Sequence, residues 1–218
     1  MKTFLNTLCV AIAAVTAAPA FATTIYKNSF ESGPGPYTGI DGGYVSPTIQ
    51  YSTQGFGAYM YIALGVPDRE ASFTLNDPNG YKDVTLSLSL AILGPWTNNS
   101  FDISVDGKSV FDATFDNVTS PTTAPGLTLL SYGSNLGFYT LGDSAAYDLT
   151  VDLGSLAPDE LHSYAFTATG LDSQSGLGLD NILITGTNVN AVPEPTNAAL
   201  LALGLAGVGI AARRRRAG

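Results

Sequence analysis

The stretch "DVTLSLSLAIL" (residues 83–93) decides the fold, because the character of its side chains alternates at every second position. Its apolar members are Val84, Leu86, Leu88, Leu90 and Ile92, and they alternate with the small or polar residues Thr85, Ser87, Ser89 and Ala91. A period of two places the apolar side chains on one face of a β-strand and the others on the opposite face. The stretch therefore predicts a strand with one buried and one polar face.

The next segment, "SFDISVDGKSVFDATF" (residues 100–115), predicts a β-hairpin around an Asp-Gly turn. A two-residue loop would place Val105 opposite Lys108, whereas a three-residue loop would place Ile103 opposite Phe111. We predict the three-residue loop, because a slip of one residue would turn the apolar face of one strand toward solvent.

Further runs rich in β-branched and aromatic residues, separated by Gly, Pro, Asn and Asp, predict strands over residues 43–51, 58–64, 71–75, 126–132, 137–141, 146–153, 162–170 and 179–186. No segment before the C-terminal tail has the apolar spacing of an amphipathic helix of ten or more residues. About ten short strands with turns between them predict an all-β fold, a two-sheet β-sandwich of the jelly-roll type. One domain over residues 23–190 is long enough to bury a sizeable core.

The N-terminal segment "MKTFLNTLCVAIAAVTAAPAFA" (residues 1–22) has an early Lys2, an apolar stretch and small residues at positions 20 and 22. This pattern predicts a secretory signal peptide that is cleaved after Ala22. The only cysteine, Cys9, would leave with it. We therefore expect an exported protein without disulfides or thiol chemistry.

Charge is concentrated in the predicted domain, where residues 23–191 contain 4 basic and 17 acidic side chains, a net charge of −13. Such a surface repels phosphate backbones, which argues against a nucleic-acid partner. It is compatible with divalent cations and with neutral sugars, and solubility alone also accounts for it.

The two ends of the predicted domain, "YKNSFESG" (residues 26–33) and "GLGLDNILITG" (residues 176–186), resemble the galactose-binding-like β-sandwiches used in carbohydrate-binding modules. The resemblance implies that the first and last strands lie close together. It also implies that an acidic residue from each end joins backbone carbonyls around a structural calcium ion, and here these would be Glu31 and Asp180. The alternative is that Glu31 is a solvated loop residue and Asp180 hydrogen-bonds the neighbouring backbone.

The sequence contains few of the residues and motifs that are typical of catalytic sites. The chain has one histidine, His162, and it contains no GxSxG, HExxH or Cys/His cluster. His162 shares a predicted strand face with Tyr164 and Phe166, which favours a packed histidine over a catalytic one. A glycosidase that uses two carboxylates distant in sequence remains an alternative, although no motif selects such a pair. We therefore predict that the protein is not an enzyme.

The only tryptophan lies in "GPWTNNS" (residues 94–100), a predicted turn that also carries two amides. An exposed indole beside amides can stack on a pyranose ring and hydrogen-bond its hydroxyl groups. The candidate sugar-binding residues are therefore Trp96, Asn98 and Asn99. The alternative, which the usual burial of large aromatic side chains favours, is that Trp96 packs in the core.

The tail, residues 191–218, begins as a linker and has three parts, which are the step Pro193, Glu194 and Pro195, the uncharged run Ala198–Ala212, and the cluster Arg213, Arg214, Arg215 and Arg216. As a helix, the uncharged run would span about 22 Å, which is less than the roughly 30 Å hydrocarbon core of a bilayer. It predicts a short transmembrane helix that inserts weakly and keeps its arginines on the cytoplasmic side.

This three-part order resembles the PEP-CTERM sorting signal of bacterial envelope proteins. The resemblance implies that an exosortase, a membrane-embedded transpeptidase-like enzyme, recognises the tail and that the processed protein leaves for the cell surface or an exopolysaccharide matrix. A plain tail anchor is the alternative. Three functions follow in order of preference: a structural or adhesive envelope or matrix protein, a carbohydrate-binding module for exopolysaccharide, and a secreted glycosidase.

Overall fold

The computed structural model describes residues 22–31, 37–38, 43–64, 68–116, 120–133, 136 and 144–189. All of them belong to one compact unit, Ala22–Val189. Residues 1–21 of the predicted signal peptide, the predicted strand at 137–141 and the predicted transmembrane helix lie outside these residues, and Ala22 is the first residue of a strand. Within the described ranges, no helix has the length and apolar character needed to cross a membrane.

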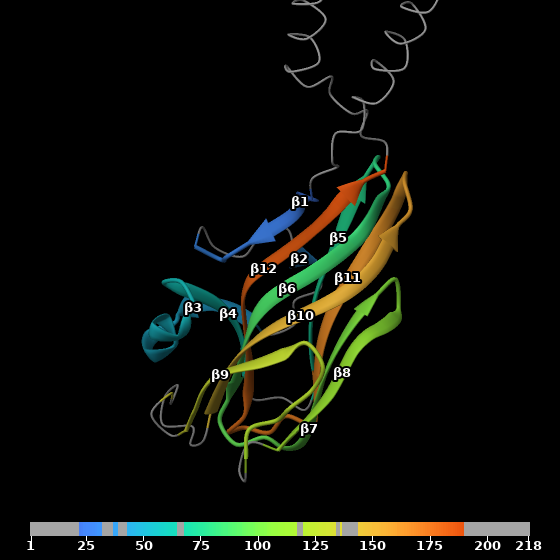
Figure 1. The fold of residues 1–218 in the computed structure, drawn as a ribbon. Helices are drawn as coiled ribbons and strands as arrows, with labels where there is room; N and C mark the ends of the chain where they lie inside the picture. Colours follow the sequence, from blue (N-terminus) through green and yellow to red (C-terminus); the bar gives the residue numbers. More distant parts are fainter. Residues whose placement is uncertain are drawn as a thin grey trace, which may run out of the picture. The chain divides into compact units, whose positions relative to one another are not determined.

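The strands form two antiparallel sheets, which confirms the predicted all-β, two-sheet arrangement (Figure 1). The seven-stranded sheet has the order β3 (Gly43–Pro47), β4 (Tyr59–Leu64), β12 (Gly176–Asn188), β6 (Tyr81–Leu93), β10 (Ser144–Leu156) and β9 (Leu127–Gly133), and β1 (Ala22–Asn28) also pairs with β12. The five-stranded sheet has the order β2 (Tyr37–Thr38), β5 (Asp68–Asp77), β11 (Glu160–Thr169), β7 (Thr97–Val105) and β8 (Lys108–Asp116).

One predicted strand is shorter than expected. The run 43–51 forms β3 only as far as Pro47, and Ile49–Gln54 form a 3-10 helix, η1, instead. The strand ends because the backbone turns at Thr48, which has helical φ and ψ angles and whose carbonyl accepts a hydrogen bond from the Tyr51 N–H at 3.0 Å.

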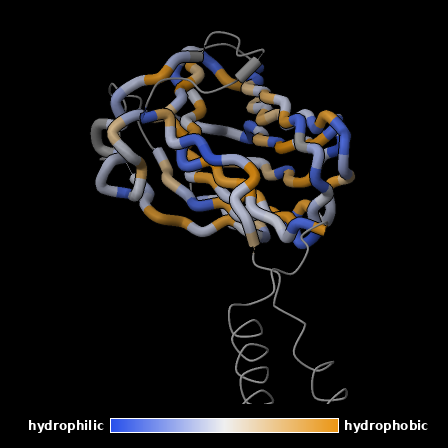
Figure 2. Tube along the Cα trace, turned by 90° about the horizontal axis from the view of Figure 1, so that it is seen from above, coloured by the Kyte–Doolittle hydropathy of each residue, from blue (hydrophilic) through white to orange (hydrophobic). Residues whose placement is uncertain are grey.

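The main core lies between the sheets, where the inward-facing side chains of both meet. Aromatic rings form its centre: Phe73 stacks on Tyr26 at a centroid distance of 4.4 Å and on Tyr164 at 4.9 Å. Hydrophobic and hydrophilic residues alternate along the strands around this core (Figure 2). The alternation that the sequence showed therefore corresponds to the two faces of each sheet.

A second apolar cluster lies on the outer face of the seven-stranded sheet, and it includes residues of η1 and of the loop that follows it. Its members are Tyr51, Phe56, Met60, Ile62, Ala91, Leu93, Leu136 and Ala146. The Tyr51 hydroxyl donates a hydrogen bond to the Ile92 carbonyl at 3.1 Å. Because this cluster covers one part of the sheet, residues 89–93 of β6 are buried on both faces, and the predicted polar face persists only in the earlier part of the strand.

The β7–β8 hairpin combines features of both predicted loops. Its loop has two residues, with Val105 opposite Lys108, so the predicted three-residue loop is wrong. Ile103 nevertheless faces Phe111, as predicted, because the register shifts between these two pairs. The shift is a β-bulge that takes up one extra residue of β8 and restores the apolar face toward the core.

The first and last strands lie side by side, as the resemblance implied. β1 pairs antiparallel with β12, from Ala22 opposite Thr187 to Asn28 opposite Ile182. The chain leaves β1 at the end where β12 carries Asp180, and this pairing brings Glu31 into that neighbourhood.

Candidate functional site

The only tryptophan is a core residue, which corrects its selection as a sugar-stacking side chain. The Trp96 side chain has 0% exposure, its Nε1 donates a hydrogen bond to the Gly176 carbonyl at 3.0 Å, and its ring meets Phe115 edge-on at 5.6 Å. A buried indole whose N–H is satisfied gains more from the core than from the rim of a turn. The exposed ring that sugar stacking needs is therefore not present at this position.

The two neighbouring amides have different surroundings. Asn99 is buried, its Oδ1 accepts a hydrogen bond from the Thr97 N–H at 2.6 Å, and its Nδ2 donates to the Gly170 carbonyl. Asn98 is exposed and has a left-handed backbone, with φ of 55°. Asn99 therefore fastens the turn to the β11–β12 loop, and of the three predicted sugar-binding residues only Asn98 faces solvent.

Glu31 and Asp180, which are distant in sequence, converge on the loop after η1. Asp180 Oδ2 accepts a hydrogen bond from the Gly57 N–H at 2.9 Å, and Glu31 Oε1 accepts one from the Tyr59 N–H at 3.3 Å. A Cβ atom at Gly57 would collide with Glu31 Oε1, so only glycine lets this carboxylate lie against the backbone there. We call Glu31 and Asp180 the acid pair.

The acid pair combines a buried carboxyl group, Asp180, with an exposed one, Glu31. Asp180 has 0% exposure, and its pKa is raised to about 6 chiefly by burial, with a further rise from the like charge of Glu31. The N–H groups of Gly57 and Asn181 oppose this rise by hydrogen-bonding the carboxylate. Among the described residues, no group of three or more His, Cys, Asp or Glu side chains is placed to hold a metal ion. A cation here would need backbone carbonyls or water beside the two carboxylates.

An open groove lies next to the acid pair on the outer face of the seven-stranded sheet. Its volume is about 310 Å³, and its lining residues are Ser87, Leu88, Ser89, Asp148, Leu149, Thr150, Asn181 and Leu183. We call it the outer-face groove. Most of its polar groups are short side chains of β6 and β10 that point away from the core, which the alternation of these strands positions.

Asn181 joins the groove to the acid pair. Its backbone N–H donates a hydrogen bond to Asp180 Oδ1 at 2.7 Å, and its side-chain Nδ2 donates to the Gly55 carbonyl at 3.0 Å and to Ser89 Oγ at 3.3 Å. Ser89 Oγ in turn donates to Asp148 Oδ1 at 3.1 Å. Asn181 has a left-handed backbone, with φ of 50°, at a bulge in β12. One chain of hydrogen bonds therefore runs from the acid pair to the groove.

A second hollow continues along the same two strands. It has a volume of about 490 Å³ and is lined by Lys82, Asp83, Thr85, Asp152, Gly154 and Ser155. Thr85 lies opposite Asp152, two residues further along the ladder from Ser87 opposite Thr150 and therefore on the same face. The outer face thus offers hydroxyl and carboxylate groups at strand spacing over two successive hollows.

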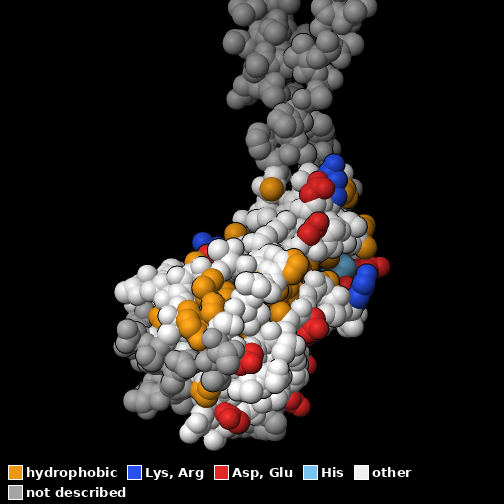
Figure 3. Space-filling view, turned by 60° about the horizontal axis from the view of Figure 1, so that its bottom comes forward, with side chains coloured by type: hydrophobic (Ala, Val, Ile, Leu, Met, Phe, Trp, Pro, Cys, Tyr) orange, Lys and Arg blue, Asp and Glu red, His pale blue; other side chains and the backbone are white. Residues whose placement is uncertain are grey.

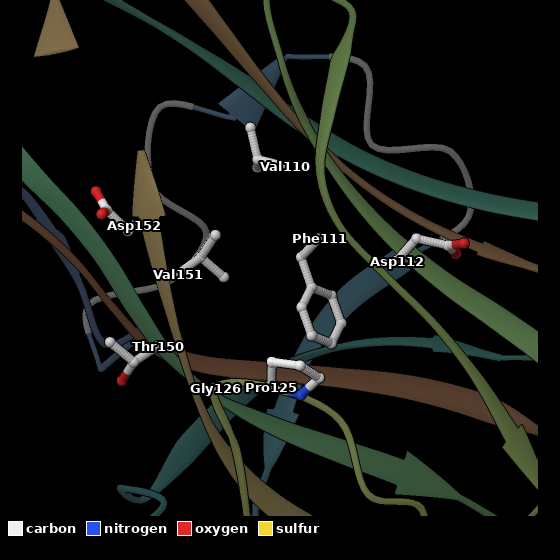
Figure 4. A pocket seen from close by; sticks show the side chains of 8 residues that line it. All are labelled: Val110, Phe111, Asp112, Pro125, Gly126, Thr150, Val151 and Asp152. Carbon is white, nitrogen blue, oxygen red and sulfur yellow. The ribbon is translucent and has the colours of Figure 1, made fainter. Parts of the chain in front are cut away.

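A third hollow, the lateral slot, opens between β8 and β10 and has a volume of about 360 Å³. In Figure 4 the side chains of Phe111, Val151 and Pro125 lie around its centre, while Asp112 and Asp152 point outward on opposite sides. Figure 3 shows hydrophobic side chains gathered on one face of the domain and acidic ones dispersed around them. The lateral slot therefore has apolar side chains at its centre, and its two carboxylates point away from each other.

Sequence reasoning found the acid pair but missed the groove. The alternating Ser and Thr residues of β6 predicted a polar face, yet a polar face is the ordinary solvent side of a strand. Only the placement of η1 shows which part of that face stays open.

The C-terminal segment is settled by comparison with known proteins. Residues 191–216 match the family model described as the PEP-CTERM protein-sorting motif. This segment is a PEP-CTERM sorting motif. The match confirms the prediction made from Pro193, Glu194, Pro195 and the arginine cluster, and these residues lie outside the part that the structure describes. No curated protein matches the sequence.

Several solved structures resemble the chain in fold. The carbohydrate-binding module TmCBM61, solved in complex with beta-1,4-galactotriose, is 12% identical, with 74% of this chain and 97% of that chain covered and a TM-score of 0.47. The K2 cleaved adhesin domain of Lys-gingipain is 15% identical, with 73% and 96% covered and a TM-score of 0.46. The CBM22-1 xylan-binding domain of Paenibacillus barcinonensis Xyn10C is 14% identical, with 80% and 99% covered and a TM-score of 0.41. At these identities the likeness concerns the arrangement of strands alone.

Proposed function

We propose that this chain is an exported bacterial envelope or extracellular-matrix protein with a structural or adhesive, non-enzymatic role. The observation that carries the proposal is the PEP-CTERM motif at residues 191–216, which follows the compact sandwich of residues 22–189. An exosortase-type enzyme in the membrane would process the tail, after brief anchoring by the apolar run 198–212. The jelly-roll-type sandwich would then reach the cell surface or an exopolysaccharide matrix.

A non-enzymatic role is supported by the way the described ionisable groups are engaged. Both ring nitrogens of His162 have hydrogen-bond partners, and Asp180 is fully buried against backbone N–H groups. The carboxylates on either side of the lateral slot point away from each other (Figure 4). A glycosidase needs two carboxyl groups that face one sugar from opposite sides. The residues named here do not form such a pair, and a glycosidase is therefore the function that we favour least.

The sorting proposal is tested by replacing Pro193, Glu194 and Pro195 with alanine. We expect export to continue and an unprocessed form to accumulate in the membrane, as seen by mass and cell fractionation. The matched control replaces Thr196 and Asn197, which follow directly, and should be processed normally. Equal release of both variants, or a wild-type protein that keeps its intact C-terminus, would reject an exosortase substrate.

A second candidate function is binding of a neutral polysaccharide along the outer-face groove. The specific support is the chain of hydrogen-bonding groups Asn181, Ser89 and Asp148 in an open hollow. Carboxylates and amides bind sugar hydroxyl groups well, and a domain with a net charge of −13 over residues 23–191 disfavours anionic glycans. The groove's lining residues include no aromatic ring, so we expect weak binding that gains strength from many copies in a matrix.

Glycan binding is tested with the domain of residues 23–190 on an array of neutral and anionic glycans. Asp148→Asn should weaken binding by about tenfold, because a charged acceptor is lost. Asn181→Gly should do the same while keeping the left-handed backbone. Asp112→Asn is the control, because that exposed carboxylate lies outside the outer-face groove. Unchanged binding in both groove variants would exclude this groove, and no binding to any glycan would leave the structural role alone.

We also propose that the acid pair holds a structural calcium ion. Glu31 and Asp180 fit such an ion in charge and in donor type, and each carboxylate oxygen that accepts one N–H keeps a second lone pair. Bound there, calcium would neutralise the pair and fasten the segment after β1 to β12 and to the loop after η1.

A further inference from the structure

His162 occupies a position in which both ring nitrogens face acceptors. It lies on β11 with its side chain buried, its Nδ1 is 2.8 Å from Asp106 Oδ2, and its Nε2 is 3.2 Å from the Ala157 carbonyl oxygen. A neutral imidazole carries one N–H and satisfies one of these acceptors, whereas the imidazolium form donates to both. The geometry therefore selects the charged form.

The carboxylate that meets His162 is fixed independently of it. Asp106 is the first residue of the β7–β8 loop and has a left-handed backbone, with φ of 53°. Its Oδ1 accepts a hydrogen bond from the Ser163 N–H at 2.8 Å, and its own N–H donates to the Ser163 carbonyl at 2.8 Å. These two bonds continue the β7–β11 pairing beyond Val105 and Tyr164. Asp106 Oδ2 is thus positioned to accept a hydrogen bond from a ring N–H of His162.

We infer that His162 is a proton-dependent clamp, which in its charged form fastens the β7–β8 loop and the β10–β11 turn to strand β11. The β7–β8 loop is distant in sequence from His162, whereas Ala157 precedes it by five residues, so the ring joins a remote loop and a neighbouring turn. This inference goes beyond sorting and glycan binding and does not depend on either.

The charged groups around His162 favour the same state. Asp106 from the β7–β8 loop and Glu160 from β11 are both negative, and the Ala157 carbonyl comes from the β10–β11 turn. Opposite it on β5 is the apolar Leu75, and Tyr164 follows on the same face of β11. Burial lowers the pKa of His162, and hydrogen bonding and these charges raise it, so that the pKa lies above its usual 6.5.

The pKa of His162 determines how its contribution to stability depends on pH. A histidine whose pKa is higher in the folded state than in the unfolded chain contributes its full stabilisation below the unfolded pKa. This contribution is lost as pH rises through the folded pKa. Above that pH one of the two hydrogen bonds is missing, and the Ala157 turn or the Asp106 loop opens more often.

The first test uses the fact that His162 is the only histidine of the chain, so its imidazole signals are unambiguous. In the domain of residues 23–190, whose core is complete within the unit, nitrogen NMR should show both ring nitrogens protonated at pH 6 and a titration midpoint above 6.5. Asp106→Asn should lower that midpoint. A midpoint at or below 6.5 in the wild type, or a single protonated nitrogen at pH 6, would overturn the inference.

The second test separates a clamp from a merely buried ring. In an Asp180→Asn background, which removes a carboxyl group whose pKa is raised to about 6, the protein that keeps His162 should have a higher denaturation midpoint than the one that also carries His162→Gln. The margin should be largest near pH 5.5 and should shrink by pH 8.5. A margin that does not change with pH would assign His162 a structural role only. Should the glutamine variant not fold, the NMR titration of the wild type still decides the inference.

Discussion

The outer face of the seven-stranded sheet has two halves that differ sharply, although β12, β6 and β10 carry both. In the covered half, Gly178, Ala91 and Ala146 lie beneath Tyr51 and the rest of the second apolar cluster. In the open half, the same strands present the outer-face groove. The covered half uses very small residues, and a Cβ at Gly178 would press against Ala91 and Met60. Small side chains thus admit a covering layer, whereas hydroxyl groups keep the sheet in contact with solvent.

The acid pair lies where the two halves meet. Asp180 and Asn181 bind the loop after η1 through the Gly57 N–H and the Gly55 carbonyl, and Asn181 also reaches Ser89 in the groove. A buried carboxylate therefore holds the boundary between the covered and the open half of this face.

The largest expected effect on stability comes from truncating a buried side chain of the covered half. Tyr51→Ala removes a fully buried aromatic side chain and should lower the free energy of unfolding by about 3–5 kcal/mol. Thr150→Ala, the matched change in the open half, should alter it by no more than about 0.5 kcal/mol, because that side chain is exposed. Chemical denaturation of residues 23–190 measures both, and similar losses in the two variants would contradict the division of the face.

Calcium binding to the acid pair should have an intermediate effect on the stability of the domain. If the native state alone binds it, stability rises by about 2.7 kcal/mol at a hundredfold excess over Kd. The melting temperature of metal-stripped protein should increase with millimolar calcium and fall again with a chelator. Glu31→Gln and Asp180→Asn should each abolish the response, and Asp112→Asn should keep it. A melting temperature indifferent to calcium in the wild type would reduce the acid pair to ordinary hydrogen-bonding residues.

The smallest expected effect is the change in stability when Asp180 binds a proton. The pKa of Asp180 is raised to about 6 in the folded protein, so the native state binds a proton more tightly than the unfolded chain does. Stability should therefore increase as pH falls, by about 1.4 kcal/mol between pH 7.5 and 5. The measurement is the difference in denaturation midpoint between wild type and Asp180→Asn, in the presence of a chelator. A difference that stays constant with pH, or that changes against wild type as the pH falls, would show that burial does not raise the pKa of this carboxyl group.

Local sequence patterns predicted much of the fold but less of the candidate site. The alternation in residues 83–93 predicted β6, and composition predicted most of the other strands, because period-two patterning records which face is buried. The β7–β8 bulge was not predictable, since loop length and register both satisfy the apolar face in more than one way. Trp96 illustrates the same limit: a turn position suggested exposure, and long-range packing against Phe115 decided burial.

Local sequence was enough to predict the class of fold, the acidic character of the domain and the sorting motif, because each depends on composition or on residues that are adjacent in the chain. Only the three-dimensional structure shows that η1 covers part of one sheet face, that the acid pair binds the backbone after η1, and that Asp106 meets His162. These arrangements join segments that are distant in sequence. Their geometry is set by strand order and register, which no local pattern of side chains encodes.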